Sequence, residues 1–272
     1  FRSSPYSLHA SAWAAGHDGG PSHAGLLSRW TLIPPVRDFN RRGMHRLIPS
    51  LYSEHGTVLA EVADNQTMLD DMILLDGATN DRIQGEQFGL SGISTFELVY
   101  GIQNAQIVRA AFLHTSQFGS RFNDQTRGAW YAAVELATSI AEVTYHKARR
   151  LAEIVVPELP GSRPDQDITT YDDWQADFHA AFHVLDPAGR YADCLQPEPI
   201  PQCYKFSQSL ARQLLDRKSN GLAYPSVRRA GAICLACFRP ALVYNPRRSK
   251  RYEIRLRTTA NGYEHRVSSV TF

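Results

Sequence analysis

The sequence predicts an α+β fold, with a mixed β-sheet core and flanking helices. Helix-like and strand-like segments follow one another without the regular βαβ alternation of a doubly wound sheet. Near the C-terminus, Ala260-Asn-Gly262 lies between two alternating segments and is a strong hairpin signal. The chain of 272 residues, 43% hydrophobic and 21% charged, has the composition of a globular protein with a sizeable core.

Residues 1–40 are predicted to form an N-terminal extension that is not a domain by itself. This stretch is rich in Gly, Ser, Ala and His, and it is interrupted by Gly19-Gly-Pro21 and Pro34-Pro35. Residues 41–272 are assigned to one domain. The role of the extension stays open.

The first part of the domain is predicted to combine extended segments with one or two helices. A proline biases the residue before it away from helix, so Leu47–Ser50 is expected to be extended. Thr57–Leu75 carries apolar residues at mixed helical spacing, which favours one or two helices. Thr95–Gln103 is expected to form a short element, and Val108–His114 a strand.

The middle of the domain is predicted to be mainly helical. Ala129–Ala133 has the pattern of a strand, and the helix predicted after it, Ala137–Val155, ends in basic residues that suit the helix dipole. Asp172–Leu185 is predicted to be an amphipathic helix. A further helix is expected over Gln208–Arg217, with Asn220-Gly221 as its C-terminal cap.

The C-terminal part is predicted to form three strands. The first lies around Cys234 in a short apolar run, and Tyr252–Thr258 and Tyr263–Val270 form the hairpin. The chain has four cysteines, and the spacing of Cys194 and Cys203 fits no common zinc knuckle. We therefore predict buried free thiols and a reducing, cytoplasmic location. No apolar run approaches the ~20 residues that cross a bilayer.

The charge pattern is compatible with an anionic ligand, with coding bias as the alternative explanation for the arginines, and it gives no strong argument for direct binding of nucleic acid. The net charge is only +2, and nearly all of the 29 basic residues are arginines, whose planar fork binds carboxylates and phosphates. A basic cluster precedes the predicted hairpin and has the alternation of a solvated strand face, which suits an acidic protein partner. Its members are Arg247, Arg248, Lys250, Arg251, Arg255 and Arg257.

Two histidines have the spacing of a metal pair on a helix. His179 and His183 stand four residues apart, but no glutamate follows His179 and no third ligand is evident. We predict no metal. The role of His146, four residues after Glu142, stays open between orienting that carboxyl and facing solvent.

Four polar residues stand in segments that could bind a bulky anion and an aromatic ring. Arg121 lies in Gly119-Ser-Arg-Phe-Asn123, Tyr131 in Gly128-Ala-Trp-Tyr-Ala-Ala133, Glu142 in Ala141-Glu-Val-Thr-Tyr-His146, and Ser226 in Tyr224-Pro-Ser-Val-Arg228. Each residue alone is unremarkable, because an arginine or glutamate is usually a solvated side chain and Ser226 could be a turn hydroxyl.

Together these segments resemble the RES-domain family. Arg121 and Tyr131 are ten residues apart, Glu142 follows after eleven more, and the Pro-Ser-Val-Arg segment precedes an apolar strand, as in the family pattern. Upstream segments around Arg46, Thr79–Arg82 and Ala110–Phe112 resemble the longer members, so that the resemblance covers about residues 44 to 258.

The resemblance implies an ADP-ribosyltransferase-like fold that binds NAD⁺ and breaks its nicotinamide–ribose bond. It assigns the stabilisation of positive charge on the ribose to Glu142. It assigns phosphate contacts to Arg121, with Arg46 as a second candidate, stacking on the cofactor to Tyr131, and a hydrogen bond to the cofactor to Ser226.

The resemblance also implies partners and leaves the acceptor open. Family members act as toxins with a DNA-binding Xre-type antitoxin, so an antitoxin and a homodimer are expected, without a metal and without direct contact to nucleic acid. Inorganic phosphate is a candidate co-substrate, with water or a protein side chain as alternatives. A non-catalytic nucleotide-binding module is the rival of another class.

Overall fold

The computed structural model describes residues 33–53, 92–153, 166–186, 189–259 and 262–271. The predicted helices within Thr57–Leu75 and the Thr79–Arg82 segment lie outside these ranges, as does most of the predicted extension. Residues 36–40, which the sequence assigned to that extension, lie in the first strand.

Seven strands form one mixed sheet, and the predicted α+β fold is confirmed. The order is β1-β2-β5-β4-β3-β6-β7, and among the described strands only β3 and β4 run parallel. The strands are β1 (Val36–Pro49), β2 (Trp130–Ala133), β3 (Gln166–Val184), β4 (Gly221–Pro225), β5 (Ile233–Cys237), β6 (Tyr244–Thr259) and β7 (Gly262–Val270).

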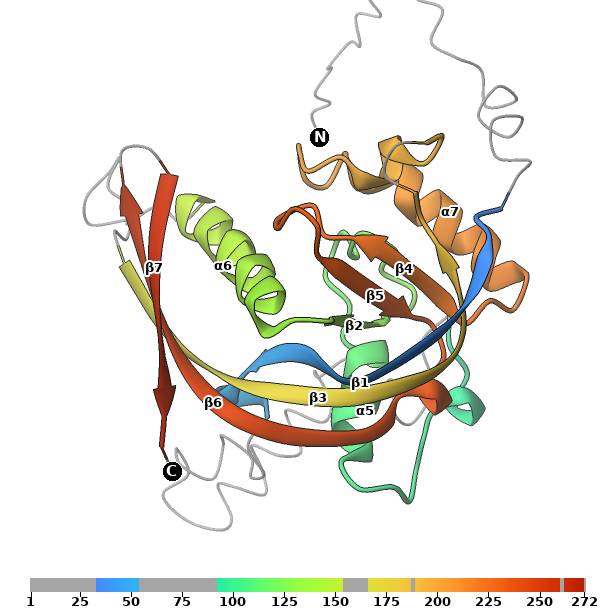
Figure 1. Ribbon diagram of the computed structural model, residues 1–272, viewed down its shortest axis with the longest axis horizontal. Helices are drawn as coiled ribbons and strands as arrows, with labels where there is room; N and C mark the ends of the chain where they lie inside the picture. The colour runs from blue at the N-terminus through green and yellow to red at the C-terminus, as the bar shows by residue number, and fades with distance from the viewer. Residues whose placement is uncertain (1–32, 54–91, 154–165, 187–188, 260–261, 272) are drawn as a thin grey trace, which may run out of the picture. The chain divides into compact units, whose positions relative to one another are not determined.

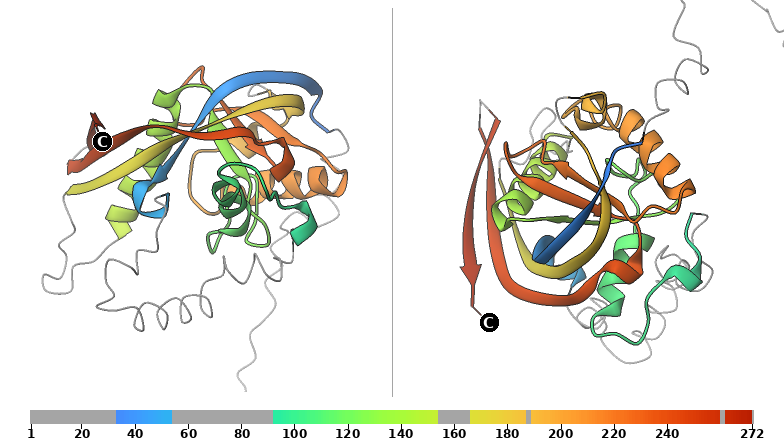
Figure 2. Two further views of the ribbon diagram at one scale, coloured as in Figure 1. Left: turned by 90° about the horizontal axis from the view of Figure 1, so that it is seen from below. Right: turned by 45° about the vertical axis from the view of Figure 1, so that its right-hand side comes forward.

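The pairings of five strands close a ring. β1 pairs with β2 through His45 and Ala133, β2 and β4 both pair with β5, and β4 pairs with β3. β3 in turn pairs with β1 along most of its length. The long strands β1, β3 and β6 curve past the short strands β2, β4 and β5, as Figures 1 and 2 show.

The helix predicted over Asp172–Leu185 is wrong, because this segment lies in the 19-residue strand β3. The buried apolar residues of this segment fit the period of a helix and that of a strand. Trp174, Phe178 and Phe182 are four residues apart, as on one face of a helix. Ala176 is also buried, which gives the spacing of two that is typical of a strand. β1 and β6 pair with the two edges of β3, so long-range hydrogen bonds replace those of a helix.

The strand predicted over Val108–His114 is also wrong, since α5 (Ala105–Leu113) is a helix. Ile107 and Val108 suggested a strand by their branched side chains. Both are buried together with Ala111 and Phe112, which is the helical spacing of i, i+3 and i+4.

The other two helices are confirmed at nearly the predicted bounds. They are α6 (Leu136–Glu153) and α7 (Tyr204–Asp216). α7 does not end at Asn220-Gly221: Lys218 takes the left-handed conformation with φ 58° and Gly221 already opens β4. No helix in the described ranges has the length and apolar character needed to cross a membrane.

Four single-turn 3₁₀ helices connect these elements. They are η1 (Ser50–Tyr52), η2 (Thr95–Glu97), η3 (Ala192–Leu195) and η4 (Pro240–Leu242). η2 is the short element expected within Thr95–Gln103, and its start is capped by Ser94 and Glu97.

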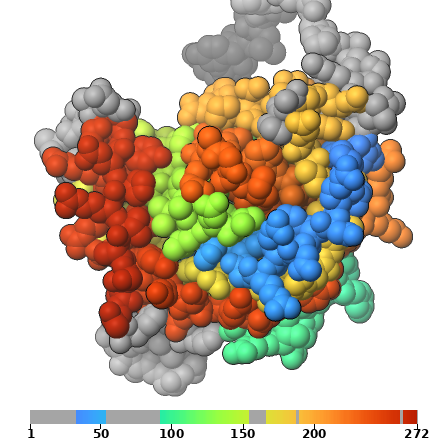
Figure 3. All heavy atoms as spheres, in the orientation of Figure 1, coloured from blue at the N-terminus to red at the C-terminus, as the bar shows by residue number. Residues whose placement is uncertain are grey.

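The apolar core fixes α6 against the sheet. Leu136, Ile140 and Val143 of α6 pack on the buried side chains of Leu47 from β1 and Ile254 from β6. Figure 3 shows the surface of the β6–β7 hairpin, in red, next to that of α6, in green. The predicted buried thiols are confirmed, because all four cysteines are free and buried.

The basic cluster is only partly the solvated strand face that the sequence predicted. Arg251 points inward and binds Asp172 of β3 through two hydrogen bonds, Nε to Oδ1 at 2.7 Å and Nη2 to Oδ2 at 3.0 Å. Asp172 is fully buried and also accepts a hydrogen bond from Ser53. Burial alone would raise the pKa of Asp172, but the hydrogen bonds from Arg251 and Ser53 bring it below its ordinary value.

We expect Asp172→Asn to lower the free energy of unfolding by about 3–5 kcal/mol, because it leaves the inward guanidinium without its carboxylate. Glu253→Gln, which removes the half-buried partner of the exposed Arg255 on the same strand, should cost less than about 1 kcal/mol. Urea titration measures both. Because the folded-state pKa is lowered, the contribution of Asp172 should be lost as the pH falls through that value. Equal losses in the two variants would contradict this.

Candidate active site

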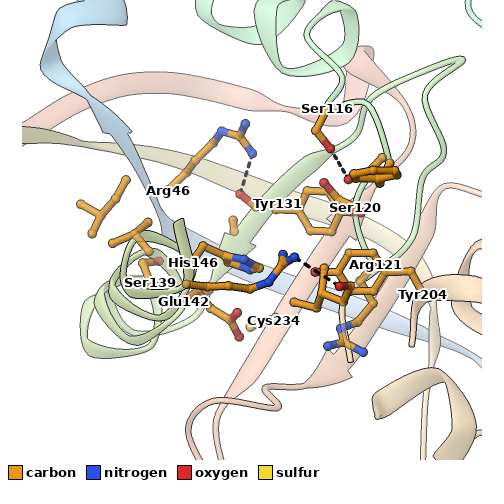
Figure 4. A pocket seen from close by; sticks show the side chains of 18 of the residues that line it. Arg46, Ser116, Ser120, Arg121, Tyr131, Ser139, Glu142, His146, Tyr204 and Cys234 are labelled. Carbon is orange, nitrogen blue, oxygen red and sulfur yellow. Dashed lines mark hydrogen bonds between the residues drawn. The ribbon is translucent and has the colours of Figure 1, made fainter. Parts of the chain in front are cut away.

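A cleft of about 490 Å³ opens between β1, β2, the loop before Arg121, α6 and the start of α7. Figure 4 shows Glu142 and His146 projecting from α6 on one side, with Arg121 and Tyr204 on the other. Four of the five predicted site residues line it, namely Arg46, Arg121, Tyr131 and Glu142. Side chains that are distant in the sequence therefore meet in one cavity.

Glu142 presents its carboxyl to the cleft from the polar stripe of α6. Ser139, Glu142, Val143 and His146 all line the cavity, at the i, i+3, i+4 and i+7 positions of one helix face. Burial raises the pKa of Glu142, although the hydrogen bond from Ser226 and the nearby arginines oppose this rise. The carboxyl is therefore poised to take up a proton more readily than an exposed glutamate.

Ser226 does not line the cavity but supports Glu142 from behind. Its hydroxyl donates to Glu142 Oε1 at 2.9 Å and accepts from the backbone N–H groups of Arg228 and Arg229, each at 3.2 Å. The interpretation as a turn hydroxyl is thus confirmed, and the same hydroxyl also fixes the carboxyl. The predicted contact of Ser226 with the cofactor stays a prediction.

Arg121 is a buried arginine tied to the segment that leads into α7. Its Nη1 donates to the carbonyl oxygens of Cys194 at 3.1 Å and Gln196 at 2.8 Å, and its guanidinium lies 5.3 Å from the ring centroid of Tyr204. Gly119, with φ 66°, makes the tight turn before it. Because Nη1 is occupied, Nε and Nη2 are the groups of Arg121 that could bind an anion.

Tyr131 supports the loop of Arg121 through its phenol. The hydroxyl accepts from Phe122 N at 2.9 Å and donates to Asn123 Oδ1 at 2.8 Å. Burial raises the pKa of Tyr131 above its ordinary value, so the phenol is neutral. Stacking on a ligand ring stays a prediction, but the structure gives Tyr131 a positioning role that the sequence did not reveal.

Arg46 extends from β1 toward the same cavity. Its Nη1 donates to the carbonyl oxygen of Tyr131 at 3.2 Å, and its guanidinium lies 5.1 Å from the ring centroid of Trp130. Burial lowers the pKa of Arg46 to about 10, which leaves it charged at neutral pH. Its Nε is buried without an acceptor among the described residues and Nη1 is occupied, so Nη2 is the group of Arg46 that could bind a ligand oxygen.

The sequence profile of the RES domain matches residues 98–257, more than half of the chain. The chain belongs to the RES domain family. Among solved structures, the RES-domain chain is similar to one described as the M. tuberculosis MbcT–MbcA toxin–antitoxin complex. The identity is 14%, the TM-score is 0.33, and the match covers 57% of this chain and 73% of the other. No curated protein matches the sequence.

His146 lies in the RES-domain cleft as a neutral imidazole. Its side chain is exposed at the surface of the cleft. Partial desolvation there and the neighbouring Arg228, Arg121 and Arg149 lower its pKa to about 4. The cleft therefore combines the half-buried carboxyl of Glu142 with cationic arginines and an uncharged histidine, which suits a ligand that carries both phosphates and a polar ring.

The two histidines with metal-pair spacing are separated on β3. His179 Nδ1 contacts Asn40 Oδ1 at 2.6 Å, and His183 Nδ1 contacts the carbonyl oxygen of Pro34 at 2.6 Å. Residues four apart on a strand are about 13 Å apart, which is too far for one ion. In the described part of the RES-domain chain, no group of three His, Cys, Asp or Glu residues could hold a metal.

His45 and Asp173 form a pair beside the cleft that the sequence did not predict. His45 lines the cleft, and its Nδ1 lies 3.0 Å from both carboxylate oxygens of Asp173. The two residues are 128 positions apart, so no local sequence pattern contains both. Only the pairing of β1 with β3 brings them together.

Proposed function

We propose that the protein is the toxin of a type II toxin–antitoxin system that depletes NAD⁺ by cleaving its nicotinamide–ribose bond. The observation that carries this proposal is the half-buried carboxyl of Glu142 in a cleft that also holds the buried Arg121 and the half-buried Arg46. Membership of the RES domain family supports it, because the sequence resembles toxins of that kind.

The residue types suit the chemistry of glycosidic cleavage. As the bond between C1″ and the nicotinamide nitrogen breaks, its electron pair leaves with nicotinamide and positive charge develops on the ribose. The carboxylate of Glu142 would stabilise this charge from a fixed position. Nε and Nη2 of Arg121 and Nη2 of Arg46 would hold the pyrophosphate.

Mass spectrometry of the products from NAD⁺ tests this proposal. The pure protein should release nicotinamide, and the other product identifies the acceptor: ADP-ribose for water, or its 1″-phosphate for inorganic phosphate. ADP-ribose retained on a protein would instead favour an ADP-ribosyltransferase. That transfer breaks the same bond, so it would change the acceptor and not the cleavage. Intact NAD⁺ that binds to the protein would favour the non-catalytic module and would overturn the proposed cleavage reaction.

A protein antitoxin is the proposed partner. The family resemblance favours an Xre-type antitoxin, and Lys250 and Arg257 of β6 are exposed basic residues that would suit its acidic surface. A homodimer of the toxin within that complex is proposed by the same resemblance. Co-expression with a cognate antitoxin should suppress both toxicity and NAD⁺ loss.

We expect Ser226→Ala to move the acidic limb of the pH–rate profile to higher pH. The hydroxyl of Ser226 lowers the pKa of Glu142, and its loss should raise that pKa further, so that the active carboxylate is lost at a higher pH. Initial rates of nicotinamide release between pH 4 and about 8 measure the shift. Ser207→Ala, which removes a buried hydroxyl bonded within α7, is the matched control. An unmoved limb would show that another group titrates.

A further inference from the structure

A buried aspartate in the cleft wall is paired with a histidine instead of a cation. Asp173 of β3 is 1% exposed, and its carboxylate contacts Nδ1 of His45 and accepts from Nε2 of Gln175 at 3.1 Å. Among the described residues no lysine or arginine forms an ion pair with it. Its neighbour Asp172, by contrast, binds Arg251. A buried carboxylate held by an imidazole is the usual device for orienting a reactive histidine.

The contact fixes the tautomer of His45. A carboxylate only accepts hydrogen bonds, so the proton of the neutral imidazole lies on Nδ1 and the lone pair lies on Nε2. The side chain of His45 is 19% exposed and lines the cleft, while that of Asp173 is buried behind it. The basic nitrogen is therefore open to a molecule in the cavity.

The position of His45 relative to Glu142 is set by α6. The hydroxyl of Ser139 donates to the carbonyl oxygen of His45 at 2.8 Å, and Glu142 stands one turn further along the same helix face. A base and a charge-stabilising carboxyl thus share the wall of one cleft. The role assigned to Glu142 needs no proton transfer, so His45 supplies a function that the four predicted residues lack.

We propose that His45 is a general base that activates water as the acceptor in the cleft, with Asp173 as its positioning residue. The inference rests on the proposed function and names the acceptor. The water oxygen bonds to C1″ while the bond to nicotinamide breaks and its electron pair leaves with nicotinamide. The water proton moves to Nε2 of His45, and Asp173 stabilises the imidazolium. The products are ADP-ribose, nicotinamide and one proton, which His45 then releases to solvent.

The decisive experiment measures nicotinamide release in phosphate-free buffer. We expect the wild-type protein to form ADP-ribose, and His45→Ala to lower the rate about 100-fold, the usual contribution of a general base. Added imidazole should restore much of the loss by occupying the space of the missing ring. His179→Ala is the matched control, because His179 of β3 does not line the cleft. This variant should retain the wild-type rate, and imidazole should not change it.

The positioning role of Asp173 is tested by asking whether the effect of its replacement depends on the presence of His45. Asp173→Asn should lower the rate of ADP-ribose formation about tenfold or more, and the double variant with His45→Ala should be no slower than His45→Ala alone, because the two residues act as a unit. A general loss of structure would instead add to the effect of His45→Ala. Melting temperatures of all variants show whether they are folded.

The outcomes separate this inference from the proposed function. Nicotinamide release that requires inorganic phosphate would overturn the role of His45 in activating water and leave NAD⁺ cleavage intact. A His45→Ala rate that equals the wild type, or that falls and does not respond to imidazole, would also overturn the inference. If His45→Ala fails to fold, His45→Gln replaces it, and a folded variant with the wild-type rate counts against the base. A wild-type protein that leaves NAD⁺ intact in both buffers refutes the proposed function itself.

Discussion

Replacing Glu142 by Gln should abolish most of the nicotinamide release, with a rate on the order of 10²–10³-fold below that of the wild type. The amide keeps the size of the side chain, and its oxygen can still accept the hydrogen bond from Ser226. What it lacks is the negative charge that would face the developing positive charge of the ribose. The loss should appear in kcat, because the charge difference matters most in the transition state.

The controls for this prediction separate charge loss from misfolding. Glu264→Gln changes an exposed carboxyl on β7, away from the cleft, and should retain the wild-type rate. Glu142→Gln should melt at or above the wild-type temperature, since a partly desolvated carboxyl with a raised pKa gains little from its charge. Expression in cells gives a second measurement, in which the variant should no longer be toxic. Equal toxicity of wild type and variant would contradict the catalytic role.

Gly119→Ala should reduce the rate of NAD⁺ cleavage about 100-fold, because it displaces the loop that carries Arg121. A Cβ atom at this position would lie 2.2 Å from the carbonyl oxygen of Asn123 and 2.6 Å from Cα of Asp124, closer than real contacts allow. The loop must therefore open. Asn123 and Phe122, which the phenol of Tyr131 holds, would move with it.

Gly101→Ala is the matched control for this prediction. Gly101 also has a positive φ, 72°, but nothing lies within 4 Å of its Cβ position. It should therefore show only the cost of a left-handed alanine, about 1–2 kcal/mol, without loss of cleavage. Thermal unfolding and kinetics of both variants are compared. If Gly119→Ala cleaves NAD⁺ as fast as Gly101→Ala, the fixed position of the Arg121 loop is not needed for catalysis.

The candidate site could be predicted from the sequence because its residues stand in ordered motifs at fixed spacing. Arg121, Tyr131 and Glu142 lie within one short stretch that folds as loop, strand β2 and helix α6, so local order carries them to one place. The same holds for the β6–β7 hairpin, whose turn signal is local. Ser226 was predicted as a site residue by the family resemblance, because the local pattern alone indicates a turn hydroxyl.

The remaining features depend on contacts between distant segments. β3 has a mixed apolar pattern, and its true state is decided by β1 and β6 on its two edges, which no local window contains. The pairing of His45 with Asp173 follows from the same register. The occupation of Arg121 Nη1 by carbonyl oxygens of residues 194 and 196 likewise needs the tertiary fold. Sequence patterns thus identify the site residues, but they do not predict the hydrogen bonds that those residues form.

The ring of five strands determines where this sheet could recruit another chain. Within the described ranges, β1 pairs with β3 along most of its length and with β2 only through His45 and Ala133, while β7 is bonded to β6 on one side and open on the other. An unpaired strand edge is a template for adding a foreign strand. The exposed charges of Glu264, His265 and Arg266 along β7 would discourage indiscriminate addition there. The open margin of β7 is therefore protected by its charged side chains against self-association through β-strand pairing.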